Sequence, residues 1–236
     1  MVLKNLYSLF LASALLLTYC NCINEKVGNM AERISDGCAQ DENIEPANLQ
    51  FWVVCSGQEL VDNVMTPLNV VEGKSKLSSI MTPLGNSMVG VADVADTVAV
   101  NRIIDEAYAS GAIDKYDICF AWSTVDSRNM VELYALWKES NGSAALEGDI
   151  VERARASCDL YGKPYIAVEL KEDAARKFTD FTECNVGKYV AIVINGVVYS
   201  APCVSGRIDG GKLEITGMFS EDEAKELAKA LNSSVK

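Results

Sequence analysis

The chain has 236 residues, 49% of them hydrophobic and 23% charged, which is ample for a self-sufficient hydrophobic core. Its formal net charge of −12 argues against nucleic acid or an anionic lipid surface as a partner, because phosphate contacts need clustered Lys and Arg. The sequence contains no histidine, so the usual general base and metal ligand is missing, and Ser or Cys nucleophiles lack their ordinary partner.

The amino terminus has the layout of a secretory leader. Lys4 precedes a mostly apolar run at residues 6–17, and small and polar residues follow at 18–24. The apolar run is shorter than the ~20 residues of a membrane-spanning helix. We therefore expect residues 1–22 to be a signal peptide and the protein to be exported, either into the periplasm or attached to a membrane of the bacterial envelope.

Cys20 and Cys22 stand where a bacterial lipoprotein carries its lipidated cysteine. Leu17, three residues before Cys20, fits a lipoprotein signal, whereas Tyr19 is larger than the residue that normally precedes such a cysteine. A lipid anchor and a soluble exported protein therefore both stay open. The other six of the eight cysteines contain no Cys-x-x-Cys pair, so no redox motif or zinc knuckle is predicted, and their pairing stays open.

The segment after the leader, residues 23–47, is polar and acidic and is predicted to be a flexible tether. Residues 49–55 are predicted to form a strand because they are apolar and aromatic and are followed by Ser56-Gly57. The Pro, Gly and Ser content of residues 66–90 predicts mostly loop.

A helix is predicted from Asp96, as its N-cap, to Gly111, as its terminator. Its apolar face consists of Val100, Ile103, Ile104 and Ala107. Residues 118–122 and 131–137 are predicted to be strands joined by a polar turn at 126–129. A short element at 146–155 is predicted to be helical.

The last third has the clearest pattern. Its predicted elements are a strand at 165–170, a helix at 172–186 with Ala174, Phe178 and Phe181 at helical spacing, a hairpin around Asn195-Gly196, a strand at 213–216 and a helix opened by the capping box Ser220 to Glu223. This order predicts an α+β fold, a ferredoxin-like sandwich of largely antiparallel sheet with helices on one face.

These residues resemble a known family, the first large periplasmic domain of SecD and fused SecDF, auxiliary subunits of the bacterial protein-export channel. The resemblance rests on Leu49-Gln-Phe-Trp52, Asp96-Thr-Val-Ala-Val-Asn-Arg102, Leu146-Glu-Gly-Asp-Ile-Val151, Gly162-Lys-Pro164 and the block 165–231. It is similar to the head part of that domain in the form found in Bacteroides-like bacteria. We expect residues 48–236 to be one SecD-like periplasmic domain, with a head-like core at 158–236.

The resemblance implies a detached periplasmic module, because no counterpart of the family's membrane helices follows residue 235, and the family's Gly-Leu-Asp-Leu-x-Gly-Gly stretch is missing. In the family, this domain is thought to engage translocating polypeptide. We therefore expect a non-enzymatic module that binds polypeptide or components of the Sec translocation machinery. The alternative is an envelope structural or interaction domain that reuses this scaffold without a role in export.

Motifs for small-molecule chemistry are weak. Residues 206–212 come close to a phosphate-binding loop but lack the Ser or Thr after Lys212, and a strand follows in place of a helix. The carboxylate pairs Glu172-Asp173 and Glu221 with Glu223 lie in first turns of helices, where capping is their ordinary role. Asp149 with Arg153 and Arg155 is read as a solvated face. No nucleotide, cofactor, metal or catalytic residue is predicted.

Apolar side chains are the better candidates for a polypeptide-binding site. Tyr199, Met218 and Phe219 cluster where the strand at 213–216 leads into the last helix, and Trp122 and Trp137 lie on the middle strands. A free sheet edge is a second way to hold an extended chain, although the sequence does not indicate which edge is open.

Overall fold

The computed structural model describes residues 46–70, 77–84 and 86–233. These residues combine helices with strands that pair antiparallel, so the predicted α+β class is confirmed. Within the described residues the strands form three separate ladders, where the element order had suggested one sheet. The predicted signal peptide, Cys20 and Cys22 lie outside the described residues.

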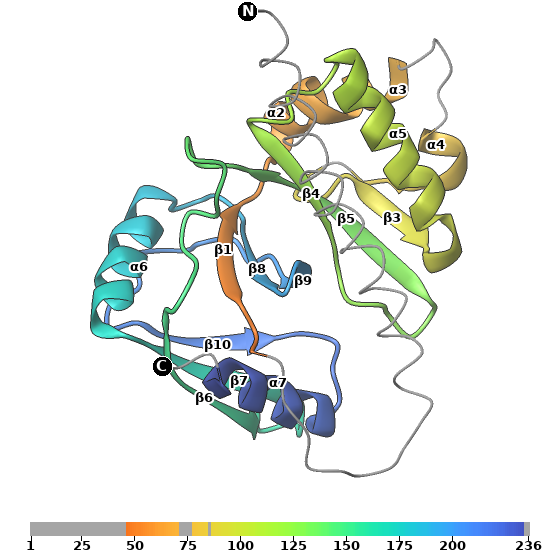
Figure 1. Cartoon of the computed structure of the whole chain (residues 1–236). Helices are drawn as coiled ribbons and strands as arrows, with labels where there is room; N and C mark the ends of the chain where they lie inside the picture. Colours follow the sequence, from red (N-terminus) through yellow and green to blue (C-terminus); the bar gives the residue numbers. More distant parts are fainter. Residues whose placement is uncertain (1–45, 71–76, 85, 234–236) are drawn as a thin grey trace, which may run out of the picture. The chain divides into compact units, whose positions relative to one another are not determined.

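One ladder occupies the middle of the chain and is backed by a long helix (Figure 1). Its strands, in spatial order, are β2 (Thr82–Pro83), β3 (Gly90–Asp93), β5 (Met130–Trp137) and β4 (Ile118–Trp122). Helix α5 (Thr97–Ser110) buries Val100, Ile103, Ile104 and Ala107 in one core cluster with Val131, Leu133 and Ala135 of β5. The predicted helix and both predicted strands are therefore confirmed.

The ends of α5 confirm one predicted cap and correct the other. Gly111 ends the helix in the left-handed conformation, with φ of 72°. At the start, the side chain of Asp96 makes no capping bond. The capping bond comes from Asp93, whose carboxylate accepts the Ala95 N–H at 2.9 Å. Asp93 thereby caps a 3-10 turn, η3 (Val94–Asp96), that leads into the helix.

The other two ladders contain the last third of the chain and one strand from its beginning. The first consists of β1 (Leu49–Val53), β8 (Val190–Ile194) and β9 (Val197–Ser200), and the second of β10 (Lys212–Thr216), β7 (Pro164–Leu170) and β6 (Val151–Cys158). Helices α6 (Glu172–Cys184) and α7 (Glu221–Ser233) share one core cluster with both ladders. Phe51 of β1 and Phe178 of α6 meet there, with ring centroids 4.9 Å apart.

Local sequence explains the hairpin and the last helix. Asn195 and Gly196 have φ of 52° and 84°, which a type I′ turn requires at both positions, so the predicted β8–β9 hairpin is confirmed. The capping box of α7 is also confirmed. The Ser220 N–H donates to Glu223 Oε2 at 2.6 Å, and the Glu223 N–H donates to Ser220 Oγ at 3.3 Å.

Two predicted segments differ in the structure. Helix α2 (Gly57–Leu60) and a π-helical turn η1 (Val61–Met65) precede the loop predicted for 66–90, and that segment is itself partly helical, with α3 (Thr66–Val70) and α4 (Leu77–Ile80). Leu60, Val64 and Leu68, spaced by four residues, are fully buried, and this burial outweighs the helix-breaking composition.

The helix predicted for 146–155 is wrong, because β6 is a strand from Val151. Its residues pair with β7, which buries Ala154 and leaves Arg153 and Arg155 exposed on the opposite face. Pairing with the next strand along the chain, rather than local propensity, decides this element.

Candidate functional site

Tyr199, Met218 and Phe219 lie together where β10 leads into α7. The rings of Tyr199 and Phe219 are half-buried, with centroids 6.2 Å apart, and both pack against the core shared by α6 and α7. Met218, between β10 and Phe219, is 62% exposed. The half-buried ring pair therefore lies next to a flexible thioether side chain that is exposed to solvent.

The Tyr199 hydroxyl is not poised for proton transfer. Burial, together with the nearby negative charge of Glu223, raises the pKa of Tyr199 to about 12. The phenol therefore stays neutral in any physiological medium. Its contribution at this place is the apolar surface of the ring.

Leu160 and Tyr161 are exposed apolar residues that the sequence analysis missed. They form the tip of the β6–β7 hairpin, with relative exposures of 101% and 90%. Asp159 Oδ1 accepts the N–H groups of Tyr161 and Lys163, each at 2.8 Å, so the tip is pinned. The sequence signal for this exposed pair was the turn formed by Asp159 and Gly162, because side chains at the tip of a tight turn point into solvent.

The hairpin tip and Met218 lie at the same end of the β6-β7-β10 ladder. Thr216, the last residue of β10, is opposite Tyr165, near the start of β7. The tip precedes β7, and Met218 follows β10, so both leave the ladder at this end. We call Leu160, Tyr161 and Met218 the apolar end of this ladder.

The two tryptophan candidates do not belong to an exposed site. Trp122 is only 3% exposed, and its Nε1 donates to Asn101 Oδ1 at 3.0 Å. Trp137 is half-buried and packs against the same core cluster as Trp122. Core packing therefore accounts for both rings.

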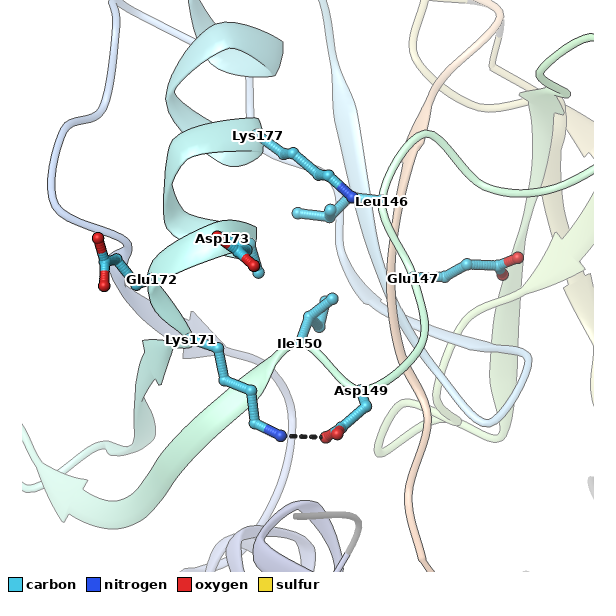
Figure 2. A pocket seen from close by; sticks show the side chains of 9 residues that line it. Leu146, Glu147, Asp149, Ile150, Lys171, Glu172, Asp173 and Lys177 are labelled. Carbon is cyan, nitrogen blue, oxygen red and sulfur yellow. Dashed lines mark ion pairs between the residues drawn. The ribbon is translucent and has the colours of Figure 1, made fainter. Parts of the chain in front are cut away.

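A hollow of about 370 Å³ lies between the segment before β6 and the start of α6 (Figure 2). Its apolar lining is Leu146, Ile150 and Ala174, and its charged lining is Glu147, Asp149, Lys171, Glu172, Asp173 and Lys177. Asp149 pairs with Lys171 at 2.6 Å, and Glu172 and Asp173 both pair with Arg176. Three of the four lining carboxylates are therefore held in ion pairs with cations.

Asp149, Arg153 and Arg155 do not form one polar cluster. Arg153 pairs with Glu169 on the neighbouring strand at 2.5 Å, while Asp149 pairs with Lys171. This agrees with the reading of a solvated face.

Other candidates for chemistry have structural roles. Glu221 pairs with Lys225 at 2.7 Å on the surface of α7. In residues 206–212, Gly210 and Gly211 adopt φ of 80° and 62° and lead into the strand β10, in place of the helix that follows a phosphate-binding loop. Across the part of the chain that the structure describes, no group of three or more Cys, Asp or Glu side chains is placed to hold a metal ion.

Comparisons with known proteins find similar sequences and structures. The family model described as "SecDF, P1 head subdomain" matches residues 128–235. SecD of Rhodothermus marinus is 31% identical over 166 residues, which cover 68% of this chain and 26% of that protein. SecDF of Thermus thermophilus is 36% identical over 132 residues, which cover 56% of this chain and 18% of that protein.

One similar solved structure is titled "Structure and function of a membrane component SecDF that enhances protein export"; it has a TM-score of 0.44 and 23% identity, covering 82% of this chain and 64% of that one. The chain thus spans about a quarter of the Rhodothermus relative. None of the helices among the described residues has the length and hydrophobicity to cross a membrane. Residues 128–235 match the SecDF P1 head subdomain model, and the chain is a SecD head-domain-like protein.

Proposed function

We propose that this protein is a non-enzymatic SecD-like module of the bacterial envelope that binds polypeptide during protein export. The observation that carries the proposal is the apolar end, where Met218, Leu160 and Tyr161 are exposed at one end of a ladder in the head subdomain. The relatives are named protein translocase subunits SecD and SecDF, which makes a polypeptide the first ligand to consider.

The size of the apolar end suits weak, reversible binding. Each large apolar side chain that becomes fully buried contributes about 1.5–3 kcal/mol, part of which is offset by the entropy of ordering the ligand. Met218 adds adaptability, because an unbranched thioether packs against side chains of different shapes. A passing polypeptide with varied sequence needs both properties.

Site-specific crosslinking in cells tests the proposal. A photoreactive phenylalanine analogue at Met218 should trap exported polypeptides or subunits of the export channel. The matched control is the same analogue at Val98, which is 59% exposed on α5 and distant in the sequence from the head subdomain. Equal adducts from both positions, or none from Met218, would contradict the proposal.

The pinned hairpin tip favours a second candidate, an envelope interaction domain without a role in export. A rigid, convex pair of apolar side chains fits a preformed pocket on a folded protein, since little entropy is lost on docking. An analogue placed at Tyr161 distinguishes the two candidates. Many products of different mass indicate passing polypeptides, whereas one product of constant mass, with export kinetics unchanged in a deletion strain, indicates a folded partner.

Export and lipid attachment are part of the proposal and rest on the leader composition, residues 1–22. The intact mass of the protein from the cell envelope should lack the leader; a lipid-anchored form keeps its lipidated cysteine as the first residue and loses only the residues before it. Labelling with a palmitate analogue then distinguishes a lipid-anchored protein from a soluble exported one. Label that is retained in the wild type and lost in a variant with both Cys20→Ser and Cys22→Ser supports an anchor, and its absence supports a soluble exported protein.

A further inference from the structure

The sequence contains two Asn-Gly pairs, Asn141-Gly142 and Asn195-Gly196, and the structure places both in turns. Such a pair is chemically labile, because the backbone nitrogen that follows an asparagine can attack its side-chain amide, and glycine has no Cβ to obstruct the attack. In a folded protein the reaction depends on how the asparagine side chain is held. The two pairs differ in this respect.

Asn195 is tied to a neighbouring strand. Its N–H donates to the Asn48 carbonyl at 3.1 Å, and its Oδ1 accepts the Asn48 N–H at 2.8 Å. Asn195 and Gly196 also form the type I′ turn of the β8–β9 hairpin, with φ of 52° and 84°. An attack on the side chain requires these torsions to change, which would break both bonds to Asn48. The sheet therefore protects Asn195.

Asn141 lies in the loop between β5 and β6, where Asn141 and Gly142 are exposed. Asn141 Oδ1 accepts two hydrogen bonds, from the Ser143 N–H at 3.0 Å and from the Ser143 hydroxyl at 2.7 Å. The hydroxyl also lies 3.0 Å from the Ala144 carbonyl, so its contact with Asn141 is the shorter one. Ala144 is 4% exposed and belongs to a core cluster, which holds Ser143 at the base of the loop.

The two Ser143 donors lie where negative charge develops during the attack. Addition of a nitrogen to Asn141 Cγ turns Oδ1 into an oxyanion, which donors that are already in place stabilise. The Gly142 N–H donates to the Glu139 carbonyl at 2.7 Å, and this bond has to open first. At an exposed loop water replaces it at little cost. A Cβ on Gly142 would meet nothing within 4 Å, so the surroundings of the attacking nitrogen are open.

We propose that Asn141 is a site of spontaneous deamidation, with the Ser143 N–H and hydroxyl as its oxyanion donors. The Gly142 nitrogen loses its proton to hydroxide and bonds to Asn141 Cγ, the Cγ–Nδ2 bond breaks, and ammonia leaves with a proton from water. Water then opens the cyclic imide at either carbonyl, which leaves aspartate or isoaspartate at position 141. The product carries one more negative charge close to Glu139. This inference is independent of the proposed function.

Ageing of the full chain tests the site. The purified protein is incubated in mildly alkaline buffer, and peptide mapping by mass spectrometry follows the conversion of amide to carboxyl at both pairs. In the folded protein Asn141 should react about tenfold or more faster than Asn195, which corresponds to a barrier lower by at least about 1.4 kcal/mol. In urea the two rates should become similar, because each asparagine then precedes a glycine in an unfolded chain. Equal rates in the folded protein would overturn the proposal.

A variant tests the role of Ser143. Ser143→Ala removes the hydroxyl donor and should slow the reaction at Asn141 by about tenfold, less than the ~10²–10³ of a donor in a water-excluded active site. Ser140→Ala is the matched control, because Ser140 is exposed in the same loop and is not one of the two donors to Asn141. Its rate should equal that of the wild type. Equal rates for Ser143→Ala and Ser140→Ala would overturn the assignment of Ser143 as the oxyanion donor.

Discussion

The side-chain amide of Asn232 closes the outer edge of β6 by bonding to both backbone groups of Ala154. Asn232 Oδ1 accepts the Ala154 N–H and Asn232 Nδ2 donates to the Ala154 carbonyl, each at 2.8 Å. The amide thereby replaces one residue of a neighbouring strand. The last turn of α7 is fastened to a strand that lies 78 residues earlier in the chain.

Removing this contact should destabilise the fold. Asn232→Ala loses two hydrogen bonds, which corresponds to a decrease of about 1–2 kcal/mol in the free energy of unfolding. Urea denaturation measures the change, and Lys229→Ala, one turn earlier on the exposed face of α7, is the control. An unchanged midpoint for Asn232→Ala would show that water replaces the amide at no cost.

Two adjacent glycines should respond very differently to alanine. Gly210 and Gly211 both have positive φ, but a Cβ at Gly210 meets nothing within 4 Å, whereas one at Gly211 would clash with Ala175 of α6, whose Cα lies 3.0 Å away. Gly210→Ala should cost about 1–2 kcal/mol from backbone strain alone. Gly211→Ala should cost about 3–5 kcal/mol, because overpacking adds to that strain. Similar denaturation midpoints for the two variants would contradict the close approach of Gly211, just before β10, to Ala175 of α6.

The cysteines should separate into two classes of reactivity. Burial, with a smaller effect of Glu59, raises the pKa of the Cys55 thiol to about 12, and burial raises the pKa of Cys119 to about 11. Cys158, Cys184 and Cys203 are exposed free thiols. Because the thiolate is the reactive form, iodoacetamide at about pH 8 should modify the exposed three first, the half-buried Cys119 more slowly, and the buried Cys55 only after unfolding in urea.

Peptide mapping by mass spectrometry reads out each position, and the urea-unfolded protein is the control for complete labelling. Early modification of Cys55 in the native protein would show that its surroundings open.

Acid should weaken the β4–β5 turn. Asp126 Oδ1 accepts the N–H groups of Met130 and Arg128, each at 2.8 Å, and these bonds, with the charge of Arg128, hold the pKa of the Asp126 carboxyl below its usual value. Since the unfolded chain binds the proton first as the pH falls, the stabilisation is complete above about pH 4 and is lost as the pH drops through the lowered pKa.

Asp126→Asn should therefore lose less thermal stability than wild type between about pH 5 and about pH 3. Melting temperatures across this interval check the prediction, with the exposed Glu226→Gln as control. Parallel curves for wild type and Asp126→Asn would rule out this role of Asp126.

Several local features were predictable from neighbouring residues. The Asn195-Gly196 turn, the Ser220–Glu223 capping box and the buried face of α5 are confirmed. Each depends on interactions within a few positions of the chain or on one periodic pattern. The four-residue spacing of Leu60, Val64 and Leu68, all of which are buried, was the sequence clue to a helical run that α3 continues into the segment assigned to a loop.

The sequence by itself determined the α+β class, the hairpin and the three long helices, because turn geometry, capping and helical periodicity depend on residues close together in the chain. Only the tertiary structure decided that β6 is a strand, that Trp122 is buried, and that Asn232 covers the outer edge of β6. These features depend on which strand or side chain each segment packs against, and the same local pattern is compatible with several such pairings.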